Sequence, residues 1–263
     1  MSSKCHSILR DQTGRLLGHI ASVSYDFKNG DQIPEHFHPE HQLVYASTGV
    51  MAVHTGQGVW IVPPMRAVWI PARTPHRIVM SGTVSMRTLY FLPSLGRGLP
   101  DKCLVMNVSA LLRELILDAC ESKILNRRKP AERRLIELIV DRLEAVPSIP
   151  LQLPHPRDPR GIRVVETLSA NPADPRPLAR LARACGASKR TVERIFERET
   201  RMTFGKWRQQ LRLLRSMELL ASGEKVAIAA LEAGYASPSA YIAMFRKELG
   251  TTPKKYLRQG SAY

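Results

Sequence analysis

The sequence predicts a multidomain α+β protein in which an all-β domain is followed by a helical segment and an all-α domain. Three observations support this prediction. Short runs rich in β-branched and aromatic residues alternate with Gly and Pro up to about Leu92, a proline-rich stretch covers residues 147–160, and apolar residues recur at helical spacing beyond it. A length of 263 residues also exceeds that of most single domains, so we expect two hydrophobic cores.

The β-rich part extends from about Arg15 to Leu92. Its apolar runs include LVYAST, GVWIVPP, AVWIPA, HRIVM and RTLYFL. Runs of this length, separated by turn residues, are typical of an all-β sandwich or a small barrel. We therefore assign residues 1–100 to an N-terminal β-domain.

Two helices are predicted next, over roughly 107–121 and 130–145. Their apolar faces are expected to contain Leu111, Leu112 and Leu115, and then Leu135, Leu138, Ile139 and Leu143. The stretch PSIPLQLPHPRDPR that follows contains five prolines and is interpreted as a linker. We assign residues 101–153 to a helical dimerisation segment and linker, with the alternative that the two helices cover the β-domain, and residues 154–263 to the C-terminal domain.

The charge is concentrated in the C-terminal domain. The chain has 39 Lys and Arg against 23 Asp and Glu, a formal net charge of +16, and residues 151–263 hold 21 basic and 10 acidic side chains, a net charge of +11. Such an excess favours a polyanionic partner. The four cysteines have no disulfide-framework or zinc-ribbon spacing, and no signal peptide or membrane-length apolar run is present, so we expect a cytoplasmic protein without a membrane partner.

The C-terminal domain contains an internal repeat. A shift of 49 residues aligns LARLARACGASKRTVERIFERETRMTFGKW, which begins at Leu178, with AIAALEAGYASPSAYIAMFRKELGTTPKKY, which begins at Ala227. Identical residues meet at several positions of this alignment, and chance is a poor explanation for them. They include the pairs Ala184 and Ala233, Ser188 and Ser237, Phe196 and Phe245, and Glu199 and Glu248.

Each copy predicts a helix, a tight turn and a second helix, over about 178–199 and 227–249. In the first copy we expect a buried stripe on the first helix, a turn at Gly186, an N-cap at Ser188 and a buried face on the second helix. The stripe is Leu178, Leu181, Ala182 and Cys185, and the buried face is Val192, Ile195 and Phe196.

The second copy repeats this plan, and a single long helix is predicted to join the two copies. The stripe is expected at Ala227, Ala230 and Leu231, the turn at Gly234, the cap at Ser237 with Pro238 at the first helical position, and the buried face at Tyr241 and Phe245. The connecting helix is expected over 204–221, with Trp207, Leu211, Leu214, Leu219 and Leu220 on its apolar side.

Such helix-turn-helix units bind DNA by placing the second helix in the major groove. In the first copy the outward face would present Lys189, Arg190, Glu193 and Arg194, with Ser188 at the helix start. Arg190 and Arg194 lie one turn apart, and either can donate two hydrogen bonds to a guanine edge, whereas Glu193 can accept from cytosine. The alternative is a solvated charged face with no partner.

The second copy is expected to anchor phosphates more than it reads bases. The side chains on its outward face are short near the helix start, at Ser237, Ser239 and Ala243. Near the helix end they are long and basic, at Arg246 and Lys247.

The doubled unit resembles the DNA-binding region of AraC/XylS-type transcriptional regulators over about residues 158–258. The resemblance is carried by GYASPSAYIAMFRKELGTTPKKY, in which the family's glycines, aromatic residues and proline appear as Gly234, Tyr235, Ser237, Tyr241, Phe245, Gly250, Pro253 and Tyr256. It implies DNA reading from Arg190, Glu193 and Arg194. Arg201 departs from the family, which usually has glycine there, so we expect either a left-handed Arg at a cost of about 1 kcal/mol or a different turn.

A dense histidine cluster lies in the stretch EHFHPEHQ, which begins at Glu35. If this stretch is one strand, alternation places His36, His38, Glu40 and Gln42 on one face, with His41 on the other. Its spacing from Gly30 to Gly49 resembles the first motif of the cupin barrels, with Gln42 where a glutamate is usual. The sequence PARTPH resembles the second motif, with Arg73 in place of glycine and ending at His76. The resemblance implies a cupin-like β-barrel that senses an effector.

Two interpretations of this cluster remain open. His36, His38 and His76 with Gln42 can hold a divalent metal such as Zn or Ni, or they can form the hydrogen-bonded lining of a metal-free effector pocket. Trp60 and Trp69 would border the effector or belong to the core. Because Gln42 removes the expected carboxylate, a metal-dependent cupin enzyme with a nucleic-acid-binding tail is the weaker alternative. An architectural nucleic-acid binder without an effector is another.

The sequence as a whole therefore predicts a sequence-specific DNA-binding transcriptional regulator. We expect it to bind promoter or operator DNA without needing a cofactor for this step, to respond to a small-molecule or metal effector, to form a homodimer and to act with RNA polymerase. We expect it not to be an enzyme.

Overall fold

The computed structural model describes residues 16–95, 98–144, 148–149 and 151–258. Two compact units are present. The first comprises the residues up to Thr55 and Trp60–Gln152, and the second comprises Gly56–Val59 and Leu153–Arg258. Cys5 lies outside the described residues, and Cys103, Cys120 and Cys185 are free thiols. In the described ranges no helix is long and apolar enough to cross a bilayer.

The first unit is built on an antiparallel sheet. Its longest strands, β3 and β6, pair over most of their length, from His41 opposite Phe91 to Thr55 opposite His76. The strands of the chain are β1 (Ile20–Phe27), β2 (Gln32–His36), β3 (His41–Thr55), β4 (Gly58–Val62), β5 (Arg66–Ile70), β6 (His76–Phe91), β7 (Leu104–Asn107), β8 (Ile124–Leu125), β9 (Ser148–Ile149) and β10 (Gln152–Pro154). A short 3₁₀ helix, η1 (Pro93–Leu95), follows β6.

The pairing path of this sheet is open. Its order is β8-β1-β6-β3-β5-β7-β9, with β2 paired to β6 and β4 paired to β3 and β10. The predicted antiparallel β-domain is confirmed, but the predicted barrel is wrong, because the strands that the structure describes do not close on themselves. The two end strands of the path, β8 and β9, are not hydrogen-bonded to each other, and helices cover one apolar face of the sheet.

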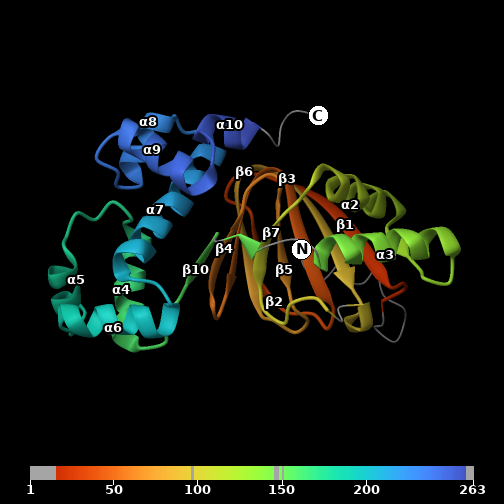
Figure 1. The fold of residues 1–263 in the computed structure, drawn as a ribbon, viewed down its shortest axis with the longest axis horizontal. Coiled ribbons are helices and arrows are strands. Elements are labelled where there is room, and N and C mark those ends of the chain that lie inside the picture. The colour runs from red at the N-terminus through yellow and green to blue at the C-terminus, as the bar shows by residue number, and fades with distance from the viewer. Residues whose placement is uncertain (1–15, 96–97, 145–147, 150, 259–263) are drawn as a thin grey trace. The chain divides into compact units, whose positions relative to one another are not determined.

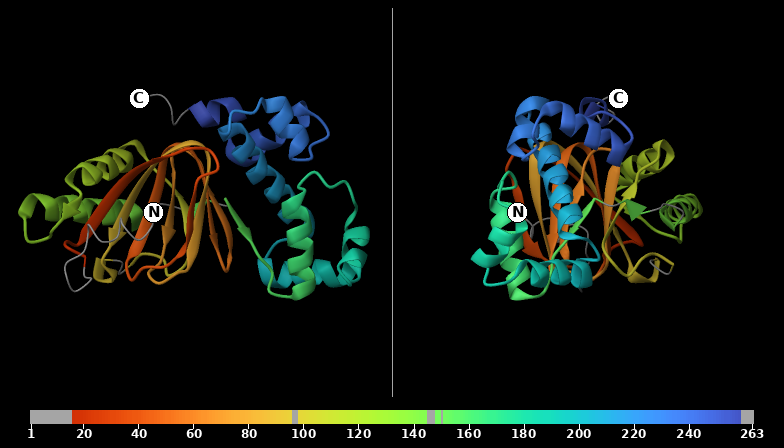
Figure 2. Two further views of the ribbon diagram at one scale, coloured as in Figure 1. Left: turned by 180° about the vertical axis from the view of Figure 1, so that it is seen from behind. Right: turned by 60° about the vertical axis from the view of Figure 1, so that its left-hand side comes forward.

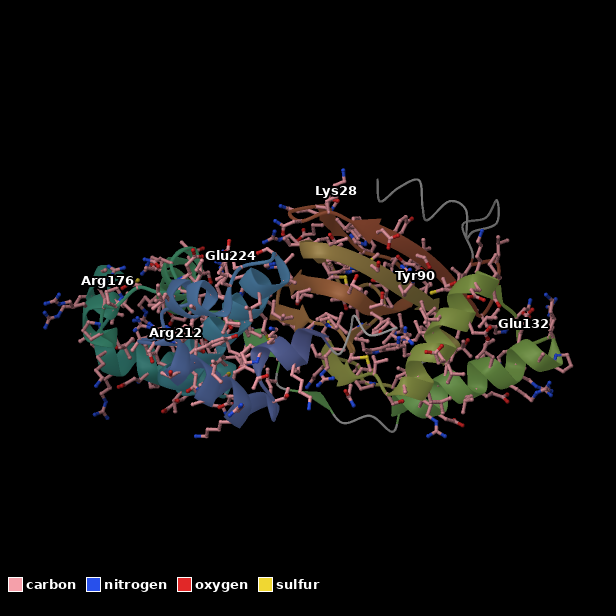
Figure 3. All side chains as sticks on the ribbon, turned by 90° about the horizontal axis from the view of Figure 1, so that it is seen from above. Lys28, Tyr90, Glu132, Arg176, Arg212 and Glu224 are labelled. Carbon is pink, nitrogen blue, oxygen red and sulfur yellow. The ribbon has the colours of Figure 1, made fainter. Side chains whose placement is uncertain are left out.

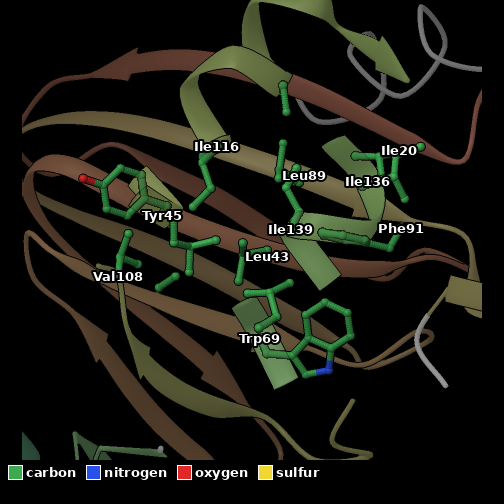
Figure 4. Packing of buried hydrophobic residues seen from close by; sticks show 14 of the residues in the cluster. Ile20, Leu43, Tyr45, Trp69, Leu89, Phe91, Val108, Ile116, Ile136 and Ile139 are labelled. Atoms are coloured by element: carbon green, nitrogen blue, oxygen red, sulfur yellow. The ribbon is translucent and has the colours of Figure 1, made fainter. Parts of the chain in front are cut away.

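Two helices provide that cover, α2 (Ala110–Ser122) and α3 (Pro130–Glu144) (Figure 1). Ser109 caps α2, and its side chain accepts a hydrogen bond from the main-chain N–H of Leu112. The inner faces of both helices belong to one buried cluster with the sheet (Figure 4). Members of this cluster include Leu43, Tyr45, Trp69, Leu89, Phe91, Leu112, Ile116, Ile136, Ile139 and Leu143. Figure 2 shows the same two helices beside the sheet from behind.

The predicted apolar faces of these helices were partly wrong. Leu111 is 47% exposed, whereas Ile116 and Ile136, which were not predicted, are buried. Asn107 also ends strand β7 instead of starting a helix. Since the buried faces pack on the sheet, the amphipathic pattern is explained by cover of the β-domain.

The proline-rich stretch is more ordered than a plain linker. Leu151 and Leu153 are buried, and the carbonyl of Leu151 accepts a 3.0 Å hydrogen bond from the N–H of Ile61. Pro159 then occupies the first turn of α4, where the missing N–H of proline costs nothing.

The second unit is helical. Its helices are α4 (Pro159–Ala170), α5 (Leu178–Ala184), α6 (Lys189–Thr200), α7 (Phe204–Ala221), α8 (Val226–Glu232), α9 (Pro238–Leu249) and α10 (Pro253–Arg258). The single long connecting helix is confirmed as α7, with Trp207, Leu211, Leu214 and Leu219 buried and Leu220 partly buried. Figure 1 shows α7 running from the level of α6 to that of α8 and α9.

The repeat is visible in the packing of aromatic rings. Phe196 of α6 meets Trp207 edge-on, with ring centroids 5.2 Å apart at 78°. At the equivalent place in the second copy, Phe245 of α9 meets Tyr256 at 5.6 Å and 79°. The shift of 49 residues also relates Arg163 of α4 to Arg212 of α7, so each copy contains three helices rather than the two predicted from sequence.

Candidate DNA-reading helices and histidine site

Helix α6, the first of the two predicted reading helices, has the construction that the sequence predicts. The hydroxyl of Ser188 accepts from the N–H of Thr191 at 3.1 Å, and Gly186 makes the turn with a φ of +72°. The predicted stripe of α5 and the predicted inner face of α6 are all buried. These contacts fix which side of α6 remains outside.

The outer face of α6 carries exposed arginines. Lys189, Arg190 and Arg194 are exposed and Glu193 is partly exposed. The Lys189 ammonium lies 3.7 Å from the carboxylate of Glu193 across one helical turn. Among the described residues Arg190 and Arg194 have no ion-pair partner, so their guanidinium groups are available to an outside acceptor. Both sit where a bidentate contact to a base or phosphate can form.

The second reading helix, α9, is built in the same way. Ser237 caps it by accepting from the N–H of Ala240 at 3.2 Å, and Pro238 occupies the first turn, as predicted. Ser239, Ala243, Arg246 and Lys247 are all exposed. On the preceding helix α8 the predicted stripe was partly wrong: Ala230 is buried as predicted, but Ala227 is exposed and Leu231 is 55% exposed, and Ala229 is buried instead.

The structure shows how the chain accommodates Arg201 at the position where the family usually has glycine. It ends α6 with a φ of 59° and a ψ of 23°, which is the left-handed conformation. The equivalent residue of the second copy is Gly250, with a φ of 76°. The first of the two expected outcomes is therefore the one observed: the arginine adopts the glycine conformation.

Helix α4 is held to helix α6 by the carboxylate of Glu199. Glu199 of α6 accepts hydrogen bonds from the main-chain N–H groups of Arg157 (2.7 Å) and Asp158 (3.0 Å) at the start of α4. Asp158 is the N-cap, and its carboxylate pairs with the guanidinium of Arg160. The hydrogen bond from Arg160 lowers the pKa of Asp158, and the hydrogen bond from Arg198 lowers that of Glu199.

In the first unit the histidine cluster is assembled from three segments. His36 ends β2, His76 begins β6 directly opposite it in the strand register, and His38 lies in the loop between β2 and β3. The ring centroids of His36 and His76 are 4.3 Å apart, and those of His38 and His76 are 5.3 Å apart. One nitrogen from each ring lies within 4.8 Å of the others.

The ring orientations are set by main-chain carbonyls. The Nδ1 atoms of His36, His38 and His76 each lie 2.8 Å from a carbonyl oxygen, of Pro34, Glu40 and Thr74 respectively. A carbonyl only accepts, so Nδ1 carries the proton and, in the neutral ring, Nε2 keeps its lone pair. Hydrogen bonding of one imidazole nitrogen to a carbonyl is the usual support of a metal-binding histidine.

Gln42 lies beside the cluster at the base of a buried polar network. Its Oε1 is 3.1 Å from Nε2 of His38, and its Nε2 donates to Thr88 (2.9 Å) and Tyr90 (3.2 Å). Nε2 of His38 and Oε1 of Gln42 both carry lone pairs, so a separation of 3.1 Å would be repulsive unless both atoms coordinate one cation. The repulsion is also removed if the amide is turned so that its NH₂ group donates to Nε2 of His38. The chemistry of three imidazoles and an amide oxygen fits Zn, Ni or Cu.

The predicted single strand through EHFHPEHQ was wrong. The strand stops at His36 and resumes at His41, because the chain turns at Pro39. The turn keeps His38, Glu40 and Gln42 buried, but Glu40 contributes its carbonyl to His38 and its carboxylate is not part of the described cluster.

The remaining aromatic candidates belong to the core. Trp69 is fully buried on the face covered by α2 and α3, and its indole N–H donates to the carbonyl of Pro100 at 2.9 Å. His41 stacks on Trp69 with centroids 5.1 Å apart, and burial lowers its pKa. Trp60 is also fully buried.

Comparison with known proteins divides the chain into the same two parts, an N-terminal and a C-terminal domain. A model of an AraC-like ligand binding domain matches residues 23–143, and a helix-turn-helix domain model matches residues 181–259. The HTH-type transcriptional regulator NimR of Escherichia coli K12 is 34% identical over 242 residues, which is 91% of this chain and 88% of NimR. The HTH-type transcriptional regulator RipA of Corynebacterium glutamicum is 34% identical over 122 residues, covering 46% of this chain and 35% of RipA.

Among solved structures, ToxT from Vibrio cholerae O395 aligns with 93% of this chain and 99% of its own, at 11% identity and a TM-score of 0.41. The near full-length similarity to NimR, together with the two matched domains, settles the family. This chain belongs to the AraC family of helix-turn-helix transcriptional regulators, with an N-terminal ligand-binding domain and a C-terminal DNA-binding domain.

Proposed function

We propose that this regulator recognises its operator mainly through Arg190, Glu193 and Arg194 of α6. The observation that supports this assignment is the exposure of Arg190 and Arg194, one turn apart, on a capped helix whose other face is entirely buried. Guanidinium groups so placed suit guanine edges, whereas Lys189 is drawn toward Glu193 and is assigned to phosphate contact.

Helix α9 is assigned a smaller share of the base reading. Its outward side chains near the helix start, Ser237, Ser239 and Ala243, are too short to place a donor or acceptor far from the helix. The longer, basic side chains of Arg246 and Lys247 suit backbone phosphates. With Ser188 and Ser237 at the two helix starts, the N-terminal dipoles of α6 and α9 add to phosphate attraction.

The effector of the N-terminal domain is proposed to be a divalent transition-metal ion, or a small molecule that binds through one. His36, His38 and His76 would supply imidazole nitrogens, and Gln42 an amide oxygen. Support comes from the three Nδ1–carbonyl hydrogen bonds, which orient the rings before any ligand arrives.

The response to the effector is proposed to be a shift between arrangements with different DNA affinity.

A homodimer is also part of this proposal. Its contact is assigned to Leu111 on the exposed side of α2, because the inner side of α2 packs on the sheet. Contact with RNA polymerase at the promoter would convert binding into a change of transcription.

The test is selection of bound fragments from a random DNA pool, with the metal-free chain and with added Zn or Ni. We expect one enriched motif whose affinity changes with the metal. An enriched motif bound equally well in every metal condition would refute the metal effector, whereas enrichment of no motif at all would refute the assignment of base reading to Arg190 and Arg194.

A further inference from the structure

A hollow of about 500 Å³ lies within the second unit, between α7 and α9. Its wall includes Arg208 and Arg212 from α7, Tyr235 from the turn before α9, and Ala243 and Lys247 from α9. Three cationic side chains thus line one cavity. Figure 3 labels Arg212 among the side chains of this unit.

The two arginines of α7 form a like-charge pair, and among the described residues no carboxylate lies within ion-pair distance of either. They lie one helical turn apart, and their hydrogen bonds go to main-chain carbonyls: Arg208 donates to Asp174 and to Arg176 (2.8 Å), and Arg212 donates to Pro172 (3.1 Å). Asp174 is itself engaged by the guanidinium of Arg176. Within the described ranges, no carboxylate forms an ion pair with Arg208, Arg212 or Lys247.

Arg208 is the most constrained member of this group. Its Nε is buried and has no hydrogen-bond partner among the described atoms. Burial, followed by the charge of Arg212, lowers its pKa, and the charge of the Asp174 carboxylate acts in the opposite direction. A positive pair held in this way is stabilised by any anion that enters the hollow, because an anion supplies both the missing charge and the missing acceptors.

The hollow opens where the repeat predicts contact with DNA. The shift of 49 residues relates Ala243 to Arg194 and Lys247 to Arg198, so the same face of α6 carries arginines. In α9 the alanine removes one of these long side chains, and Ala243 and Lys247 are both exposed. A group approaching the outer face of α9 can therefore reach Arg208 and Arg212 behind it.

We propose that this hollow binds one phosphate group of the DNA backbone, held by Arg208, Arg212 and Lys247. The inference rests on the DNA-binding role of the domain. A phosphate offers the oxygens that a guanidinium prefers and carries no base information, so the contact would fix the position of the second copy on the duplex without selecting its sequence. Because α7 joins the two copies, one contact on it would restrain both.

The first test compares Ala243→Glu with Ala243→Gln in the full chain. The glutamate places a carboxylate at the mouth of the hollow, where it pairs with the arginines, and the glutamine has the same size without the charge. We expect Ala243→Glu to bind both operator and random DNA several-fold more weakly than Ala243→Gln, with a slope of log K against log salt smaller by about 0.9. We also expect its second unit to unfold at a higher temperature at low salt, which general repulsion of DNA would not produce.

The second test removes one positive charge at two places. Lys247→Gln should reduce the salt slope by about 0.9 on both DNAs, whereas Lys254→Gln, which changes another exposed lysine on α10 outside the hollow, should leave it unchanged. Equal slopes for these two variants, or equal stability of the two Ala243 variants, would overturn the proposal.

If the hollow binds a free anion instead of a DNA phosphate, different results are expected. Millimolar inorganic phosphate, compared with chloride at equal ionic strength, would then stabilise the unsubstituted chain but not Ala243→Glu, and the two Ala243 variants would have equal salt slopes on DNA. That combination would overturn the assignment to the DNA backbone. Loss of all DNA binding by the unsubstituted chain would instead contradict the family function.

Discussion

The main-chain N–H of Arg73 donates a 2.7 Å hydrogen bond to the carbonyl oxygen of His38. Arg73 holds a left-handed φ of 62° in the turn before β6, and His38 lies in the loop between β2 and β3. The next hydrogen bond along, from the N–H of Ala72 to Nδ1 of His41, joins the same two segments. The loop that carries one histidine of the cluster is thus fixed by the turn that leads to another, His76.

Removing ring nitrogens from the cluster should abolish metal binding. We expect a His36→Ala, His38→Ala double variant to lose Zn and Ni, because two of the three imidazoles are gone. The matched control is His54→Ala on β3, a histidine outside the cluster, which should keep the metal. Elemental analysis and metal titration provide the measurement. A chain that binds no added metal, or a double variant that binds as the control does, favours the metal-free lining.

Replacing the left-handed arginines by glycine should stabilise the protein. Arg201→Gly and Arg73→Gly each remove the steric cost of a side chain at positive φ, about 1 kcal/mol. As a control, Arg194→Gly in the interior of α6 should destabilise by about 1 kcal/mol. Chemical denaturation measures all three. Destabilisation by Arg201→Gly would mean that contacts of its side chain outweigh the backbone cost.

Truncation of the reading arginines should weaken specific binding selectively. Arg190→Ala or Arg194→Ala should cost about 1–3 kcal/mol on the selected operator and little on random DNA, since a base contact is lost rather than a phosphate contact. Binding isotherms on both DNAs at one salt concentration give the comparison. Equal losses on operator and random DNA would reassign the two arginines to the backbone.

Acidification should destabilise the second unit through its paired carboxylates. The hydrogen bond from the Arg176 guanidinium lowers the pKa of the buried Asp174, and Arg160 and Arg198 act in the same direction on Asp158 and Glu199. The folded unit therefore binds these protons less readily than the unfolded chain, so its stability is complete above the unfolded pKa, about 4, and is lost as the pH falls below it.

The variant that checks this is Asp174→Asn. It should lower the free energy of unfolding by about 1–3 kcal/mol at neutral pH and make the decline between about pH 5 and pH 2 shallower. Denaturant titrations at several pH values supply the data. Parallel declines of the variant and the unsubstituted chain would show that Asp174 does not contribute to the acid sensitivity.

The sequence predicted the α-helical unit well where side chains differ strongly in polarity. On α6 three large apolar residues alternate with charges, so Val192, Ile195 and Phe196 were assigned correctly. On α8 the sequence VAIAALE is apolar at nearly every position, and periodicity cannot select the buried side. The structure buries Ala229 rather than Leu231.

The histidine cluster was predicted from the resemblance to the two cupin motifs, although the local structure was not. Strand alternation assumed a continuous chain direction from His36 to Gln42, and the turn at Pro39 interrupts it. The hollow behind α9 could not be predicted, because only the tertiary structure brings Arg208, Arg212 and Lys247 to the wall of one hollow. The extension of the repeat to Arg163 and Arg212 was detectable in the sequence and was missed because few other residues there are identical.

The unbroken helix α7 belongs to both copies at once. Phe204 packs edge-on against Phe196 of the first copy, with ring centroids 5.4 Å apart, and Arg212 lies at the turn of the second. Each residue added to a helix turns everything beyond it by about 100° and advances it about 1.5 Å. A one-residue insertion in the middle of α7 would leave each copy folded yet set the two out of phase on the double helix. If α6 and α9 bind DNA together as proposed, the length of this helix would set the spacing of the two DNA elements that they occupy.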